Sequence, residues 1–167
     1  MTFWLVLGVI IVQRVVELGL SKRHTAWMRA QGGQEYGREH YPWMVALHLG
    51  FLLSMLLEHL ARPVRIFPAF WVPIILAQAL RYSAIWALGN FWNTRVWILP
   101  GAAPVRRGIY RLFPHPNYAA VVLEIFCIPA LFGLWVTAVL FTLLNAWMLS
   151  LRIRVENRAL GRHRFSG

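Results

Sequence analysis

The sequence contains no aspartate, a single cysteine and a single lysine, and only 14% of its 167 residues are charged. Chemistry that depends on an Asp dyad, an Asp-rich Mg²⁺ site or a Ser-His-Asp triad is therefore excluded. Cys127 permits no internal disulfide and lies in an apolar run, where it is interpreted as a small core residue. No Cys/His spacing indicates zinc, so we expect no metal site.

Apolar residues dominate the rest of the chain, with 59% hydrophobic residues and a mean hydropathy of +0.53. A soluble domain of this size could not bury so many apolar side chains, because its surface is too large for its volume. The composition therefore predicts an all-α, polytopic integral membrane protein with a single membrane domain over residues 1–167.

The apolar runs predict about five transmembrane helices. Residues 1–89 hold three spans, expected at 2–20, 41–61 and 66–89, each near the ~20 residues that cross a bilayer. The first run lacks the features of a signal peptide, so we expect it to remain as a span. Residues 90–167 hold a loop, a helical hairpin over 118–151 and a tail. The first hairpin arm has about twelve residues, or ~18 Å at ~1.5 Å per residue, so a re-entrant arm is the alternative to a full span.

The net charge of +11 rests almost wholly on arginine. Basic residues gather in 21–40, 90–117 and 152–164, whereas only Arg62 and Arg65 occupy the opposite side of the predicted topology. The positive-inside rule then places the N-terminus outside, and the active site and C-terminus in the cytoplasm, at the inner or plasma membrane of a bacterium. Anionic membrane lipids explain this charge better than nucleic acid, which we do not expect as a partner. The oligomeric state is left open.

Ionisable side chains within spans are costly and are functional by default. With the orientation above, Arg14, Glu17, Arg81 and Glu124 gather in the cytoplasmic half and predict a polar cavity open to the cytoplasm. The alternative is purely structural: an i,i+3 pair of Arg14 with Glu17, and an interhelical pair of Arg81 with Glu124.

Three further polar residues lie in the predicted spans. Asn145 is a polar group in the last helix. His48 is interpreted as a hydrogen-bonded core histidine, and Glu58 as a cap at the membrane interface.

A polar motif introduces the hairpin, Gly108-Ile-Tyr-Arg-Leu-Phe-Pro-His-Pro-Asn-Tyr118. The step from His115 to Pro116 sets an extended backbone before a helix that starts at about Asn117. That helix start offers N–H groups and a positive dipole end to an anionic ligand, while His115 and Tyr118 add donors and a stacking face. The alternative is an ordinary helix N-cap.

A second motif follows the hairpin, Arg152-Ile-Arg-Val-Glu156. Residues four apart share one helix face, and the hairpin would bring this face back to the level of His115. Taken alone, Arg152 and Glu156 would be an ordinary surface pair. The two motifs together, separated by about 35 residues, are more specific than either one.

This arrangement resembles the isoprenylcysteine carboxyl methyltransferase family of membrane enzymes over roughly residues 90–165. It is also similar to a small bacterial branch, associated with type III polyketide synthases, that O-methylates alkylpyrones and alkylresorcinol-type lipids. The resemblance implies S-adenosyl-L-methionine as the cofactor and a lipophilic small molecule that enters from the bilayer as the methyl acceptor. The cofactor-binding residues that it implies are Ala102, Ala103, Pro104, Val105, Tyr110, His115, Pro116, Asn117, Tyr118 and Glu156.

The resemblance also implies that Arg152 faces the oxygen of the acceptor. If the acceptor is an acidic enol, it arrives ionised and Arg152 stabilises the oxyanion. A less acidic phenol requires a general base, for which Glu17 and Glu124 are the candidates. The chain departs from the family at Pro114, where an arginine is usual, and at Asn157, where a second glutamate is usual.

Three other functions remain open from the residues. One is carboxyl methylation of an isoprenylated cysteine, which requires a prenylated protein partner. Another is an NADPH-dependent lipid reductase with a related helical hairpin. The last is a membrane scaffold without enzymatic activity, which predicts that replacement of His115 is tolerated.

Overall fold

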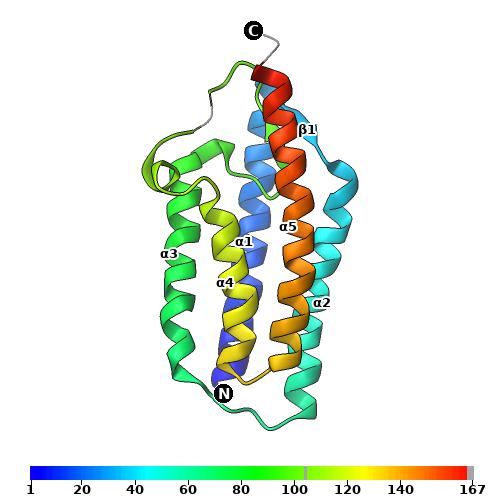
Figure 1. Cartoon of the computed structure of the whole chain (residues 1–167), viewed down its shortest axis with the longest axis vertical. Coiled ribbons are helices and arrows are strands. Elements are labelled where there is room, and N and C mark those ends of the chain that lie inside the picture. The colour runs from blue at the N-terminus through cyan, green and yellow to red at the C-terminus, as the bar shows by residue number, and fades with distance from the viewer. Residues whose placement is uncertain (104, 165–167) are drawn as a thin grey trace. The chain divides into compact units, whose positions relative to one another are not determined.

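The structure, a computed structural model, describes residues 1–103 and 105–164, and for residues 160–164 only the backbone. Within these residues the chain forms five α-helices (Figure 1): α1 (Thr2–Ala30), α2 (Tyr41–Ala61), α3 (Trp71–Leu88), α4 (Pro116–Leu131) and α5 (Trp135–Arg164). Short 3₁₀ turns flank them: η1 (Arg38–His40), η2 (Pro68–Phe70), η3 (Gly89–Phe91) and η4 (Gly108–Arg111). The strands β1 (Gln34–Tyr36) and β2 (Val96–Ile98) form a small antiparallel pair with Glu35 opposite Trp97.

Four helical segments among the described residues are long and apolar enough to cross a membrane, namely Thr2–Ala30, Arg38–Ala61, Pro68–Phe91 and Trp135–Ala159. The chain is therefore an all-α polytopic membrane protein, as the composition predicts. Helix α4 is apolar but has only 16 residues. At ~1.5 Å per residue it is ~24 Å long, shorter than the ~30 Å hydrocarbon core. Whether α4 crosses the bilayer stays a prediction.

Helix α1 is about ten residues longer than its apolar run predicts. The end of the apolar run predicts a loop at 21–40, but the helix continues to Ala30 and ends before Gly32 and Gly33. The continuation contains neither proline nor glycine, and the buried face runs on through Glu17, Ser21, His24 and Met28 at helical spacing. Glu17 therefore lies near the middle of α1, whereas the predicted span at 2–20 would place it in the last turns of the helix.

The predicted hairpin of α4 and α5 is present. Pro129 and Gly133 in the sequence predict its turn at 129–133, but only 132–134 separate the two helices. Pro129 is inside α4, and the helix ends at Leu131. The backbone N–H of Leu134 then donates to the carbonyl of Pro129 at 3.0 Å, and Gly133 takes φ +70°. A Cβ at position 133 would lie 3.2 Å from the ring of Phe67, so glycine suits both the backbone conformation and the close approach. The first arm thereby gains four residues over the expected twelve.

The chain divides into two compact units. Unit 1 comprises residues 1–41, 88–105 and 151–167, and unit 2 comprises residues 42–87 and 106–150. Helix α5 contributes residues to both units. The expectation of a single membrane domain over 1–167 stays a prediction.

In unit 2, Glu58 of α2 caps the N-terminus of α5. Its carboxylate accepts hydrogen bonds from the backbone N–H groups of Val136 at 3.2 Å and of Thr137 at 2.8 Å. It also accepts one from the Thr137 hydroxyl at 2.7 Å, and that hydroxyl lies 2.8 Å from the hydroxyl of Ser54. A carboxylate at this end of a helix satisfies free N–H groups and complements the helix dipole. The interpretation of Glu58 as a cap is confirmed.

Replacing Glu58 with alanine is expected to lower the free energy of unfolding by about 1–2 kcal/mol, because an N-cap and a charge–dipole interaction are lost together. The denaturation midpoint of the detergent-solubilised protein would measure this loss. The Glu58→Gln variant keeps an acceptor oxygen, so a smaller decrease is expected for it. Equal midpoints for wild type and Glu58→Ala would contradict the capping role.

Candidate functional site

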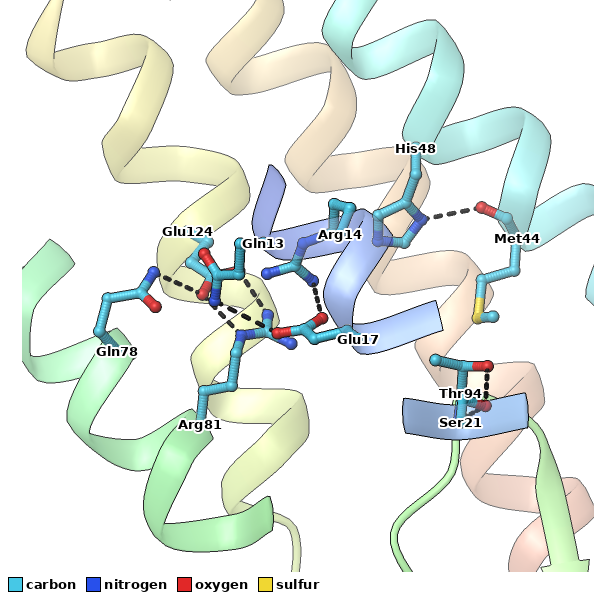
Figure 2. A network of polar contacts seen from close by, with 10 residues as sticks. All are labelled: Gln13, Arg14, Glu17, Ser21, Met44, His48, Gln78, Arg81, Thr94 and Glu124. Atoms are coloured by element: carbon cyan, nitrogen blue, oxygen red, sulfur yellow. Dashed lines mark hydrogen bonds and ion pairs between the residues drawn. The ribbon is translucent and has the colours of Figure 1, made fainter. Parts of the chain in front are cut away.

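A buried ion pair joins α3 and α4 in unit 2 (Figure 2). Arg81 donates to the Glu124 carboxylate through Nε at 2.8 Å and through Nη2, and the two side chains are only 2% and 6% exposed. Gln78, one turn before Arg81, adds a hydrogen bond to Oε1 of Glu124 at 3.0 Å. The interhelical pair that the sequence analysis gave as the structural alternative is therefore present.

The position of Arg81 follows from the buried face of α3. The other buried residues of this helix are Ile74, Ala77, Ala84 and Ala87, which recur at intervals of three or four. Small side chains let a neighbouring helix approach closely, as is typical of packing within membranes. The long arginine is the exception on this face, and it reaches the carboxylate on α4.

The start of α4 holds four of the predicted cofactor residues. Pro116 is the first residue of the helix and is buried, and the carbonyl of His115 accepts hydrogen bonds from the N–H groups of Tyr118 and Ala119, each at 3.2 Å. The rings of His115 and Tyr118 stack with centroids 5.2 Å apart and an interplanar angle of 17°. Oδ1 of Asn117 is buried without a hydrogen-bond partner. The predicted start of this helix at about Asn117 is confirmed to within one residue.

The 3₁₀ turn η4, which carries the predicted cofactor residue Tyr110, lies beside the end of α3. Arg107 donates through Nε to the carbonyl of Ala87 at 2.7 Å. Gly108 takes φ +54°, and a Cβ on it would lie 3.2 Å from the Cβ of Ala87. Arg107 thereby fixes the loop before Tyr110 to unit 2.

In unit 1, Glu17 of α1 is 6% exposed and pairs with its own helix. Arg14 Nη1 lies 2.9 Å from its Oε2, and Gln13 donates to its Oε1 at 3.2 Å. The i,i+3 pair given as the alternative is therefore present, and Figure 2 shows both glutamine and arginine beside the carboxylate. Both predicted base candidates, Glu17 and Glu124, are engaged by an arginine and a glutamine.

Unit 1 also contains the second motif. Arg152 and Glu156 are half-buried on the C-terminal part of α5. One residue before Glu156, Val155 packs against Gly37, where an added Cβ would lie 2.9 Å from Cγ1 of Val155. The segment after β1 is thus held close to the α5 turn that carries Glu156.

The loop after β2 carries the remaining predicted cofactor residues. Ala102 and Ala103 are exposed, and Val105 is half-buried. Pro104 lies outside the described residues.

Two polar clusters in unit 1 were missed by the sequence analysis. The Ser21 hydroxyl of α1 lies 2.8 Å from Oδ1 of Asn93 and 2.8 Å from the hydroxyl of Thr94, as Figure 2 shows for Thr94. Three residues on, Nδ1 of His24 lies 2.7 Å from the carbonyl oxygen of Trp92. The sequence does indicate this cluster, because the helical spacing of the buried face of α1 continues past residue 20. These contacts fix the start of the loop at 92–105.

The second missed cluster surrounds Arg95. Its Nη1 donates to Oε1 of Glu35 at 2.7 Å, and its guanidinium lies 4.1 Å from the ring centroid of Tyr41. The hydrogen bond to Glu35 raises the pKa of Arg95 above its usual value. This cluster stabilises the β1–β2 pair, and no motif in the sequence indicates it.

The predicted residues thus fall into two sets. Unit 2 holds Tyr110, the segment His115 to Tyr118, and Glu124, and unit 1 holds Glu17, Ala102, Ala103, Val105, Arg152 and Glu156. Their roles stay predictions. Among the described residues, no group of three or more His, Cys, Asp or Glu side chains is arranged to hold a metal ion.

Comparison with known proteins gives one family and two relatives. Residues 69–162 match the isoprenylcysteine carboxyl methyltransferase family. The chain is 39% identical to "Uncharacterized protein YpbQ" of Bacillus subtilis, over 95% of this chain and 96% of that protein. It is 24% identical to an "Uncharacterized protein" of Haemophilus influenzae, over 90% of each chain. No solved structure matches the chain significantly.

Proposed function

The chain belongs to the isoprenylcysteine carboxyl methyltransferase family, and from this membership we propose that it transfers a methyl group from S-adenosyl-L-methionine to an oxygen of a lipophilic small molecule. Membership in this family makes the chain a membrane methyltransferase. The observation that carries the proposal is the extent of the family match, residues 69–162, which includes both the hairpin motif at 108–118 and the pair of Arg152 and Glu156.

The residues at the start of α4 fit such a cofactor. Oδ1 of Asn117 is buried and has no partner, and a buried acceptor of this kind is normally satisfied by a bound donor. The stacked rings of His115 and Tyr118 offer an aromatic face to a planar group. A nucleoside with amino and hydroxyl donors and an aromatic base satisfies both features.

In the proposed mechanism the cofactor supplies an electrophilic methyl group on its sulfonium sulfur. The work of this chain is then positioning and electrostatics. His115, Asn117 and Tyr118 bind and orient the cofactor, and Glu156 accepts a hydrogen bond from it. Arg152 faces the attacking oxygen and stabilises its negative charge before transfer.

The environments of the two glutamates favour an acidic acceptor. Glu124 already accepts hydrogen bonds from Arg81 and Gln78, and Glu17 from Arg14 and Gln13. These contacts occupy both oxygens of each carboxylate, so neither glutamate is oriented to take a proton from an acceptor. An enol that is ionised before it binds requires no base, so we take an alkylpyrone as the acceptor in preference to an unactivated phenol. The active site faces the cytoplasm in this proposal, and the acceptor enters from the bilayer.

The test incubates purified protein with labelled S-adenosyl-L-methionine and one of three acceptors: an alkylated hydroxypyrone, an alkylresorcinol of the same chain length, or a prenylcysteine analogue. Labelled pyrone is the expected product, and the cofactor is expected to raise the Tm whereas NADPH is not. The His115→Ala protein is expected to lose this rise in Tm. Methylation of the prenylcysteine analogue alone would replace the proposed acceptor, and stabilisation by NADPH alone would contradict the methyltransferase.

A further inference from the structure

Helix α5 buries an amide that lacks a partner. Asn145 is 2% exposed, and its Nδ2 has no hydrogen-bond partner within the described residues. One turn earlier, Oγ1 of Thr142 is also buried and unpartnered, although a threonine hydroxyl in a helix usually bonds the carbonyl three or four residues before it. Residues three apart lie on adjacent turns of one helix face, so both side chains emerge from the same face of α5.

This pair lies inside unit 2 and not against lipid. Phe141, one turn before Asn145, packs edge-on to Phe51 of α2 with ring centroids 5.7 Å apart. The lipid-facing side of α5 is instead formed by exposed apolar side chains, which are Leu140, Leu143, Leu144 and Trp147. Asn145 therefore lies on the buried face of α5, opposite the exposed apolar side chains.

The pair also lies at the depth of the ion pair between α3 and α4. Glu124 precedes Gly133 by nine residues and Thr142 follows it by nine, so equal helical rise on the two hairpin arms brings them to one level. Unit 2 thus has a polar layer within otherwise apolar helices. In this layer Glu124 accepts from Arg81 and Gln78, whereas the Asn145 donor is unused.

An unused amide in this setting is costly, since neither lipid nor apolar side chains can replace the hydrogen bond to water. Buried polar groups without a protein partner are the exception in folded proteins, and a bound ligand is one explanation for those that persist. The unused atom is a donor, so the ligand must present an acceptor oxygen.

We propose that Asn145, with Thr142, binds the ring carbonyl of the methyl acceptor and so selects a carbonyl-bearing enol, such as an alkylated hydroxypyrone, over a phenolic lipid. This inference rests on the proposed function and adds a specificity residue to it. Asn145 is a positioning residue: it orients the ring and takes no part in proton or methyl transfer. Thr142 provides a second polar atom on the same face.

The experiment compares wild type with Asn145→Leu, in which a side chain of similar size carries no donor. The KM for the hydroxypyrone is expected to rise about tenfold, the loss of one hydrogen bond, with little change in kcat. The rise in Tm that the hydroxypyrone causes should become smaller, while the rise caused by S-adenosyl-L-methionine is unchanged. The Tm without ligand should stay equal or increase, because an unpaired buried amide has been removed.

Ser54→Ala is the matched control, since Ser54 is also polar and within a span but bonds Thr137. It is expected to lower the Tm and leave the KM unchanged. If Asn145→Leu behaves in the same way, the residue is structural and the inference is wrong. Should Asn145→Leu not fold, Thr142→Val is measured instead, and an unchanged KM there overturns the inference.

The outcomes also separate this inference from the proposed function. If wild-type protein methylates neither lipid, the proposed function itself is wrong. If wild-type protein methylates the hydroxypyrone and the alkylresorcinol equally well, and Asn145→Leu behaves like wild type, the proposed function stands. Only the role of Asn145 is then wrong.

Discussion

Replacing Arg81 with methionine is expected to destabilise the protein by about 3–5 kcal/mol, a large fraction of the total stability of a typical protein. The substitution removes the arginine that pairs with the buried Glu124 carboxylate, while the hydrogen bond from Gln78 is kept. Removing one partner of a buried ion pair costs more than the pair contributed, because the desolvation of the remaining charge is no longer offset by that partner. The denaturation midpoint in detergent, together with the yield of monodisperse protein, measures the effect.

The double variant Arg81→Met with Glu124→Leu is the control. Apolar side chains of similar volume remove both charges, so most of the lost stability is expected to return. Methyltransferase activity of this double variant also tests the role of Glu124 as a general base. Activity near that of wild type would show that Glu124 is structural, whereas a folded but inactive double variant would support a catalytic role. A folded, stable Arg81→Met single variant would contradict the importance of the pair.

Replacing Arg152 with alanine is expected to lower kcat by about 10²–10³-fold, the range seen when one donor to a developing or reacting oxyanion is removed. In the proposed mechanism Arg152 holds the charge of the acceptor's oxygen, whereas Glu156 binds the cofactor. The two variants should therefore differ. Arg152→Ala should retain the rise in Tm caused by S-adenosyl-L-methionine, and Glu156→Gln should reduce that rise and increase the KM for the cofactor.

Arg158, six residues further along α5 and exposed, supplies the matched control for the loss of a positive charge on this helix. Arg158→Ala should leave the kinetic constants unchanged. Turnover by Arg152→Ala at the wild-type rate would refute the assigned role. Equal losses of cofactor binding in Arg152→Ala and Glu156→Gln would show that both residues hold the cofactor.

Hydrophobic runs, together with the prolines and glycines that interrupt them, predicted most of the fold, because a span in lipid must satisfy its backbone hydrogen bonds within a helix. The limits of α2 at residues 41 and 61 match the prediction. The main error, the end of α1, arose because its extension is polar outside and buried only at every third or fourth position. A hydropathy average over consecutive residues does not detect buried residues at this spacing, whereas a search for helical periodicity does.

The candidate site was predictable in its residue types more than in its partners. Charged residues inside spans led to Arg81 and Glu124, since an ion pair is the common way to tolerate them in lipid. The contact of Arg95 with Glu35 was not predictable, because it depends on the register of two three-residue strands. The unpartnered donor of Asn145 was also beyond the sequence, because partner atoms are visible only in three dimensions.

The ion pair between α3 and α4 has a consequence for biosynthesis. Arg81 and Glu124 are 43 residues apart in the chain, and Glu124 lies on a helix of only 16 residues, so α3 is complete before the partner carboxylate on α4 is made. An arginine inside a span makes insertion into lipid costly, and a carboxylate on a neighbouring helix lowers that cost. Insertion of α3 is therefore expected to be more favourable once α4 has been synthesised.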